Sequence, residues 1–147
     1  MFELVAAGAA PVCVTNDKDL KMIWGNHYDP VKKVSWFIPE DEADLWFWYQ
    51  MLIGDPVDNI KGVPGIGPKK ADKILSQAIL DYEADKLTKA SQGLQTDSLW
   101  PYYHEAVLSE YSCYEEFEMN AKCLWIFRER GGIWNQWVGL KAELMLS

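Results

Sequence analysis

The stretch Gly54–Leu75, GDPVDNIKGVPGIGPKKADKIL, decides the fold of this chain. Proline removes a backbone donor and glycine weakens regular structure, so the run VPGIG at 63–67 is neither helix nor central strand. Pro68 fits the first position of a helix, where its missing N–H costs nothing. Beyond it the pattern is helical, with Ile74 and Leu75 facing a core. The stretch therefore predicts a tight glycine turn that opens a helix.

This turn has the properties of an anion site. A helix start presents exposed backbone N–H groups and a positive dipole end, and Lys69 and Lys70 fall in its first turn. A repeating phosphate backbone is the ligand that such a site predicts. The alternative is a glycine-rich turn that merely joins two helices of a bundle. We favour the phosphate site because glycines, lysines and upstream acids coincide in one short stretch.

Two pairs of carboxylates stand out. Asp55 and Asp58 lie three residues apart around a proline, just before the glycine turn. Asp17 and Asp19 directly follow a predicted strand, where ligand groups lie in open α/β sheets. The D-x-D spacing lets two carboxylates approach one cation. Taken alone, this turn is better interpreted as solvated, with an N-cap aspartate before the helical run that begins at Leu20.

The combination GDxxDNIxGVPGIGxKxA strongly resembles the helix–three-turn–helix (helix-hairpin-helix) segment of the 5′ nuclease superfamily. This superfamily includes flap endonucleases, the 5′-nuclease domains of bacterial DNA polymerases, and phage 5′–3′ exonucleases. The upstream run VTNDKDLKMI resembles the strand and acidic turn that precede the hairpin in the same family. The C-terminal helical pattern is most similar to that of T7-like phage exonucleases.

The resemblance implies metal-dependent hydrolysis of phosphodiester bonds at DNA 5′ ends, as in DNA replication. The implied metal ligands are Asp17, Asp19, Asp55 and Asp58. Their hard oxygen donors suit Mg²⁺ or Mn²⁺ and not zinc. The implied contacts to the phosphates of double-stranded or flap DNA come from Lys61, Gly65, Gly67, Lys69 and Lys70. A K⁺ ion is implied at the hairpin carbonyls near Val63–Ile66.

The resemblance covers the later half of the family's pattern. A complete member begins with a strand that carries an essential aspartate, followed by an acidic cluster, whereas Glu3 is the one acid before Asp17 here. Two hypotheses follow, and neither assigns a catalytic residue with certainty. In the first, the chain is part of a 5′–3′ exonuclease or flap endonuclease, and a separate N-terminal half supplies the other acids. In the second, it is a non-catalytic helix-hairpin-helix module that binds DNA.

Composition bounds these hypotheses. The chain has 147 residues, 49% of them apolar, and eight tryptophans, which predicts a folded domain and not a disordered tail. Its net charge of −8 is unusual for a DNA-binding protein, because affinity comes largely from neutralising phosphates. Four lysines nevertheless cluster around the glycine turn, at positions 61, 69, 70 and 73. We expect weak, salt-sensitive DNA binding by this chain alone.

Localisation signals are few. Three cysteines, Cys13, Cys113 and Cys123, have no metal-binding spacing and are predicted to be reduced, mostly buried thiols. No apolar run reaches the roughly 18 residues of a membrane span, and the N-terminal stretch lacks the basic region of a signal peptide. We therefore expect a cytoplasmic protein without a membrane partner, in the bacterial host cell if the gene belongs to a phage.

The rest of the sequence is mostly helical in pattern. Helices are predicted over Phe2–Ala10, Ile38–Leu52, Ala71–Leu87 with a break near Ser76, Leu99–Tyr111 and Tyr114–Arg130. Short strands are predicted at Val12–Thr15, of the type buried on both faces, and at Ile23–Trp24 and Val34–Phe37. His27 falls in the intervening loop and is interpreted as a polar loop residue. Ile133, Trp134 and Trp137 are expected to pack back as a tail.

We thus expect a mainly α fold with a small α/β remnant, like the C-terminal half of a 5′ nuclease. Residues 1–37 would form a truncated catalytic portion with the D-x-D turn. Residues 38–80 would form the DNA-binding segment, and residues 81–147 a C-terminal helical portion packed into the same domain. The strand at Val12–Thr15 would lack sheet neighbours and leave an exposed edge, which costs stability.

Overall fold

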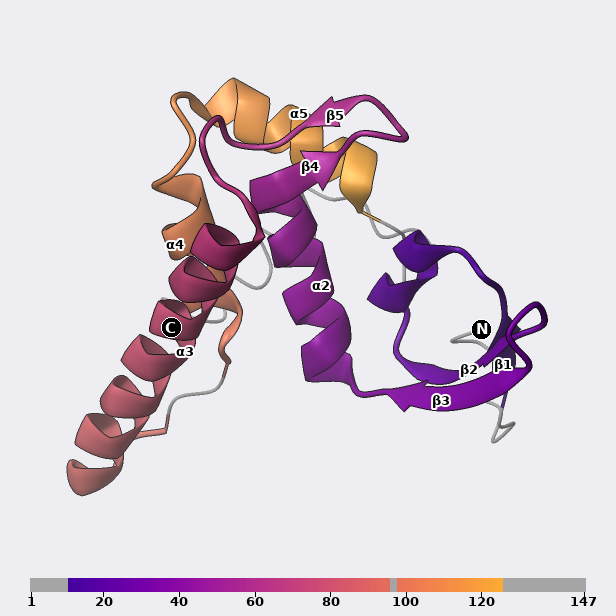
Figure 1. Cartoon of the computed structure of the whole chain (residues 1–147). Coiled ribbons are helices and arrows are strands. Elements are labelled where there is room, and N and C mark those ends of the chain that lie inside the picture. The colour runs from indigo at the N-terminus through magenta and orange to yellow at the C-terminus, as the bar shows by residue number, and fades with distance from the viewer. Residues whose placement is uncertain (1–10, 96–97, 126–147) are drawn as a thin grey trace. The chain divides into compact units, whose positions relative to one another are not determined.

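The computed structural model describes residues 11–95 and 98–125, which fall into two compact units (Figure 1). Within these ranges, residues 11–47 belong to the first unit and residues 48–125 to the second. Helices dominate and the sheets are small, as the sequence predicted. The helix expected over Phe2–Ala10 and the tail around Trp134 lie outside the described residues. None of the described helices is long and apolar enough to cross a bilayer.

The first unit contains a three-stranded sheet in the order β1-β2-β3. The strands are β1 (Val12–Val14), β2 (Gly25–Asp29) and β3 (Val34–Ile38), and the 3₁₀ helix η1 (Lys18–Met22) connects the first two. β1 runs parallel to β2, and β3 runs antiparallel to it. The prediction that β1 is buried on both faces is wrong, because Val12 and Val14 are 51% and 63% exposed. Among the described residues β1 is an edge strand, as expected.

The hairpin that follows η1 is shifted from its predicted position. The segment expected to be a loop forms β2, and the turn lies four residues later. Asp29 sets this turn, because its Oδ1 accepts hydrogen bonds from the N–H groups of Val31 (2.8 Å) and Lys32 (2.9 Å). Lys33 closes the turn in the left-handed region, with φ of 57°. Short side chain-to-backbone bonds of this kind are not visible in hydrophobic periodicity.

His27 is a buried strand residue and not the polar loop residue that the sequence predicted. Only 1% of its surface is exposed, and its ring stacks on Trp36 with centroids 5.4 Å apart. Its Nε2 lies 2.7 Å from the carbonyl oxygen of Ile23, which makes Nε2 the protonated nitrogen. The opposite nitrogen has no hydrogen-bond partner among the described residues. The imidazole is therefore part of the sheet's packing.

Helix α2 (Glu40–Ile53) carries the chain from the first unit into the second and confirms the predicted aromatic helix. Glu40, Asp41 and Glu42 occupy its first turn, where the helix dipole favours negative charge. It contributes core residues, as expected: Phe47, Trp48, Met51 and Leu52 are fully buried.

The core of the second unit is built around Trp48. Its ring contacts residues of α4 (Trp100–Leu108) and α5 (Tyr114–Leu124), and α3 (Pro68–Ser91) packs against α4. The Trp48 ring lies 4.7 Å from Trp100 and 6.3 Å from Phe117, measured between centroids. His104 touches both Trp48 and Phe117 edge-on, and burial lowers the pKa of this imidazole. It therefore behaves as a neutral aromatic residue of the core at pH 7.

Two helix boundaries differ from the prediction. Helix α3 runs without a break past Ser76, because that side chain is exposed while Leu75 and Ala78 keep the helical spacing of the buried face. Helix α5 was expected to continue to Arg130, but it ends at Leu124. Trp125 has extended backbone angles (φ −71°, ψ 120°), and its ring packs on Trp100 at 5.9 Å. Burial of this indole against α4 thus ends the helix.

A buried polar link connects α5 to the C-terminal end of α2. Asn120 is 7% exposed, and its Nδ2 donates to the Lys61 carbonyl oxygen at 2.7 Å and to the Tyr111 hydroxyl at 3.0 Å. The Tyr111 hydroxyl in turn donates to the carbonyl oxygen of Met51. Both amide hydrogens of Asn120 are used in this link.

Two glycines cross closely at the end of α2. Short strands β4 (Gly54–Asp55) and β5 (Ile60–Lys61) pair antiparallel, with Gly54 opposite Lys61. Gly54 has φ of 75°, and a Cβ on it would overlap backbone atoms of Gly62 and Ile60. A Cβ on Gly62 would overlap backbone atoms of Leu52, Ile53 and Gly54. Both positions therefore require glycine for space, and Gly54 requires it for conformation as well.

The crossing predicts a large stability loss on substitution. We expect Gly62→Ala to lower the free energy of unfolding by about 3 kcal/mol or more, because only backbone could move aside. Gly67→Ala is the matched control, since a Cβ there meets nothing within 4 Å and its φ is −96°. As Gly67 is an N-cap, its cost should stay below about 1 kcal/mol. Urea denaturation measures both, and equal losses would contradict the steric account.

Candidate functional site

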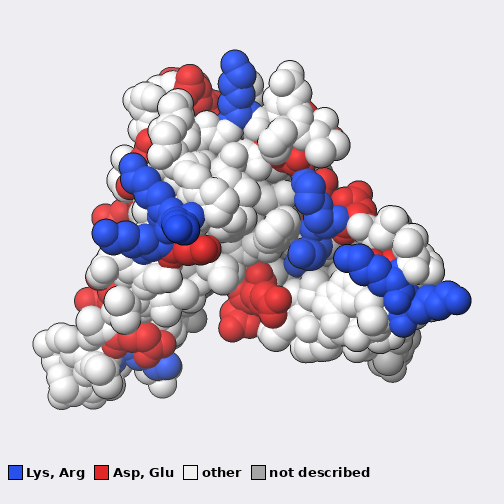
Figure 2. Space-filling model, viewed as in Figure 1, with Lys and Arg blue, Asp and Glu red and all other residues white. Residues whose placement is uncertain are grey.

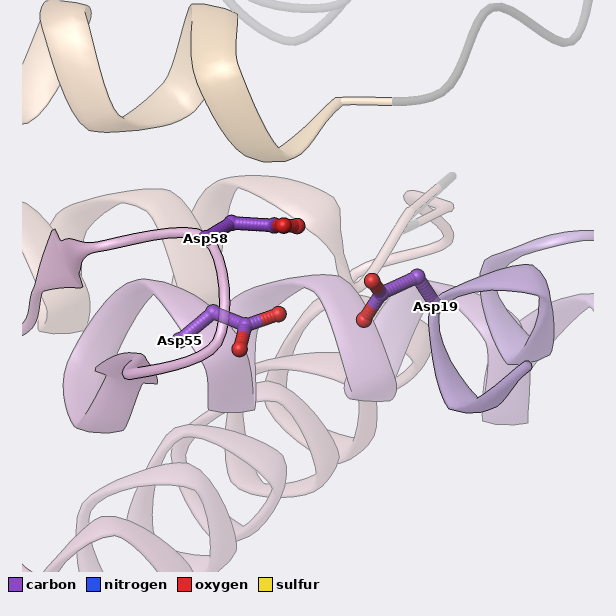
Figure 3. Close-up of side chains that lie close together, drawn as sticks. All are labelled: Asp19, Asp55 and Asp58. Carbon is purple, nitrogen blue, oxygen red and sulfur yellow. The ribbon is translucent and has the colours of Figure 1, made fainter.

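The strongest candidate site is the acid loop, which we define as the β4–β5 connection with Asp55 and Asp58 (Figure 3). Asp55 is only 1% exposed, whereas Asp58 is exposed. Each offers a carboxylate oxygen, and these oxygens lie within 4.8 Å of one another. The sequence predicted that these two carboxylates act together, and the loop does bring them together.

Local hydrogen bonds explain why the loop holds this shape. The Oδ1 atom of Asp55 accepts the N–H of Val57 at 3.1 Å, which fixes the carboxylate against its own loop. The N–H of Asn59 donates to the carbonyl oxygen of Pro56 at 3.3 Å. Asn59 then adopts φ of 56°, a left-handed conformation that asparagine tolerates better than most residues. The chain consequently turns back within a few residues and returns to β4.

Electrostatics at the acid loop favour a bound cation. Two carboxylates this close repel each other, and burial of Asp55 removes much of the water that would screen the repulsion. A divalent cation removes the repulsion and supplies partners for both oxygens. Carboxylates alone, without thiolate or imidazole, make a donor set that suits Mg²⁺ or Mn²⁺. The residues present therefore fit a hard cation.

The D-x-D turn belongs to the first unit and is ordered by its own side chains. The N–H of Asp17 donates to Thr15 Oγ1 at 2.9 Å, and Asp17 Oδ1 accepts the N–H of Asp19 at 3.0 Å. Asp17 is thus the N-cap of η1, as the simpler interpretation of the sequence held. Asp19, which Figure 3 also labels, lies in the first turn of η1 and pairs with Lys18 at 3.1 Å. That all four acids share one metal site stays a prediction.

A second candidate feature is the phosphate turn, which we define as residues 63–70. The Ile66 N–H bonds to the Val63 carbonyl oxygen at 3.2 Å, and Gly65 has φ of 79°. Gly67 is the N-cap of α3 and Pro68 its first residue, as predicted. The N–H of Ala71 donates to the carbonyl oxygen of Gly67. The N–H groups of Lys69 and Lys70 therefore come before the first hydrogen bond of this helix.

Basic side chains gather where this turn opens α3 (Figure 2). Lys69, Lys70 and Lys73 are all exposed, and Lys61 is exposed on β5. No carboxylate occupies the first turn of α3. The backbone amides, the positive helix end and the lysines therefore all attract an anion.

Sequence reasoning missed two residues that hold the site. Gly62 was not singled out, although its position eight residues after Gly54 was a usable signal for a close backbone crossing. Asn120 was also missed, and no signal could have found it. Its burial against Lys61 joins positions that are 59 residues apart in the sequence.

Comparisons with known proteins agree with this architecture. The chain is 35% identical over 98 residues to DNA polymerase I of Rhizobium leguminosarum, a match that covers 59% of this chain and 10% of the polymerase. Its fold is similar to that of a mutant T5 5′-exonuclease, with a TM-score of 0.52 and 19% identity. That match covers 83% of this chain and 50% of the exonuclease. No family model matches the chain.

The chain therefore spans half or less of the length of both proteins. The polymerase contributes a relationship in sequence, and the exonuclease contributes a likeness in fold. Both fit the superfamily that the motif around the glycine turn resembles. The sequence relationship and the similar fold support the resemblance to the 5′ nuclease superfamily.

Proposed function

We propose that this chain is part of a metal-dependent 5′–3′ exonuclease or flap endonuclease that hydrolyses phosphodiester bonds at DNA 5′ ends. One observation carries the proposal: a close carboxylate pair lies a few residues before a glycine turn that opens a helix with two lysines. The first feature suits a divalent cation and the second suits phosphate. Their proximity along a short chain segment is what cleavage next to a bound DNA backbone requires.

In this proposal Asp55 and Asp58 hold the cation, and Asp17 and Asp19 contribute from the D-x-D turn. Asp17 would do so while one of its oxygens continues to cap η1. When bound, such a cation activates a water molecule or stabilises the leaving oxygen. The protein's own contribution is rigid placement, because the Asp55 carboxylate is buried and fixed by the Val57 amide.

The proposed contacts to the duplex come from Lys61, Gly65, Gly67, Lys69 and Lys70. The small glycines let a phosphate approach the backbone amides, while the lysines neutralise charge without reading sequence. Residues 38–80 would then act as a helix-hairpin-helix segment, and the carbonyls of Val63–Ile66 would take the K⁺ ion that the family resemblance implies. The partner is DNA with a free 5′ end or flap.

The second hypothesis is a helix-hairpin-helix module that binds DNA and has no catalytic activity. The described residues favour it in one respect. Within residues 11–95 and 98–125, the grouping of metal-binding side chains accounts for one cation, whereas a two-metal reaction needs ligands for two. Both hypotheses share the phosphate contacts and differ in turnover.

The carboxylate pair predicts cation binding. We expect the double variant Asp55→Asn and Asp58→Asn to bind Mn²⁺ at least tenfold more weakly, because two charged ligands become neutral amides of equal size. The variant Asp41→Asn with Glu42→Gln makes the same charge change on exposed residues of α2 and should bind as before. Paramagnetic resonance of free Mn²⁺ gives both affinities. Equal affinity for Mn²⁺ in all three proteins would refute the metal site at Asp55 and Asp58.

The lysines of the phosphate turn predict the salt dependence of DNA binding. Lys69→Ala with Lys70→Ala should weaken binding to all sequences alike and reduce the slope of log K against log salt by about two. Lys86→Ala with Lys89→Ala, on the same helix but far from its start, is the matched control and should leave the slope unchanged. Fluorescence anisotropy with a flap duplex at several salt concentrations measures this. If both double variants lower the slope equally, positive charge spread along the helix, and not the phosphate turn, accounts for DNA binding.

A nuclease assay tests the activity itself. Duplex and flap DNA labelled at the 5′ end would be incubated with the chain and Mn²⁺. Release of label that the Asp55→Asn, Asp58→Asn variant abolishes would mean that the acids of this chain suffice for hydrolysis without a separate N-terminal half. Salt-dependent binding without release would favour the non-catalytic hypothesis. Absence of both binding and cleavage would overturn both hypotheses.

A further inference from the structure

The D-x-D turn is held at both ends by two neighbouring residues of β2. On its N-terminal side, the N–H of Thr15 donates to the carbonyl oxygen of Tyr28 at 2.9 Å. On its C-terminal side, the imidazole of His27 donates through Nε2 to the carbonyl oxygen of Ile23 at 2.7 Å. The segment between these two bonds leaves β1 and returns to β2 as a loop (Figure 1). Adjacent residues of one strand thus close the loop that carries both acids of the turn.

The bond on the C-terminal side matters because η1 is too short to hold its own position. It has five residues, and a 3₁₀ helix of this length has poor hydrogen-bond geometry and little stability alone. Ile23 is the C-cap of η1, and its N–H donates to the carbonyl oxygen of Leu20 at 3.0 Å. The carbonyl group that His27 holds therefore belongs to the residue that ends the helix. Asp19 lies in the first turn of the same helix.

His27 is well suited to fix this carbonyl group. Its ring is stacked on Trp36 and almost fully buried, so the donor is held in place. Burial also shields the hydrogen bond from water, which makes loss of the donor costly. Nδ1 has no hydrogen-bond partner among the described residues, so within them the bond to Ile23 is the one hydrogen bond of the ring. A phenyl ring would also pack on Trp36, so what the histidine adds is the donor.

We propose that His27 is a positioning residue for the D-x-D turn, which holds η1 in the orientation that presents Asp17 and Asp19 to a divalent cation. The inference rests on the proposed function, in which both acids contribute to the cation site. His27 acts through the Ile23 carbonyl group and the helix that this residue ends, and not as a ligand. Residues that orient metal ligands from outside are worth about tenfold or more in metal affinity.

Two substitutions at His27 separate the donor from the ring. His27→Phe keeps a ring to stack on Trp36 and removes the donor, whereas His27→Gln supplies an amide N–H in place of the Nε2 donor. We expect His27→Phe to bind Mn²⁺ about tenfold more weakly and His27→Gln to retain the affinity of the unaltered chain. Asn26→Ala, at the neighbouring exposed residue of β2, is the control and should also retain it. Paramagnetic resonance of free Mn²⁺ measures these affinities.

Amide hydrogen exchange shows whether the effect is local. In His27→Phe the amides of Asp19 and Ile23 should exchange faster, while the Thr15 amide, held by the other bond of the loop, stays protected. Equal Mn²⁺ affinity in His27→Phe and the unaltered chain overturns the proposal, as does equal weakening in His27→Gln or loss of protection at Thr15. If the unaltered chain bound no Mn²⁺, the proposed function would fail, and hydrogen exchange would still test the hold on η1.

If His27→Phe does not fold, the unaltered chain decides. Titration with Mg²⁺, followed by NMR, should shift the Nε2–H resonance of His27 together with the amide resonance of Asp19, because the imidazole and the turn are joined through Ile23. A shift of the Asp19 amide without any change at His27 overturns the proposal.

Discussion

The close crossing of two backbone segments at Gly54 and Gly62 is the constraint on which the second unit depends. Here the end of α2 and the start of the phosphate turn approach so closely that neither position has room for a side chain. The nearby hydrogen bond from Val63 N–H to the Leu52 carbonyl oxygen, at 2.9 Å, holds the two segments together. Everything between them must form a closed loop, and that loop carries Asp55 and Asp58.

This closure links two chemistries that need different environments. The Asp55 carboxylate is buried, whereas the lysines of α3 lie on an exposed surface. The crossing provides both, because the chain leaves the acid loop at Gly62 and reaches the N-cap of α3 at Gly67. α5 supports the arrangement from behind through Asn120 and its bond to Lys61. A cation site and a phosphate site can thus lie near one another without sharing residues.

Sequence patterns predicted what local chemistry determines. Pro68 as the first residue of α3, the aromatic helix α2 and the proximity of Asp55 to Asp58 all followed from spacing and residue type. The patterns failed where a single side chain or a distant contact decided the outcome. Asp29 moved the hairpin turn by capping it, the stack on Trp36 buried His27, and packing of Trp125 on Trp100 ended α5 early. The union of Asp17 and Asp19 with the acid loop stays a prediction.

The polar link through Asn120 also has a consequence for the order of folding. Its hydrogen bonds join Tyr111 to Met51 and Asn120 to Lys61, across 60 and 59 residues of chain. Closing such long intervals costs chain entropy that short-range helices do not pay. During synthesis α2 and α3 can therefore form well before the acid loop gains its rear support. The bond from Asn120 to Lys61 can form only after α5 has been made, so a chain cut short before Asn120 would keep its motif without this support.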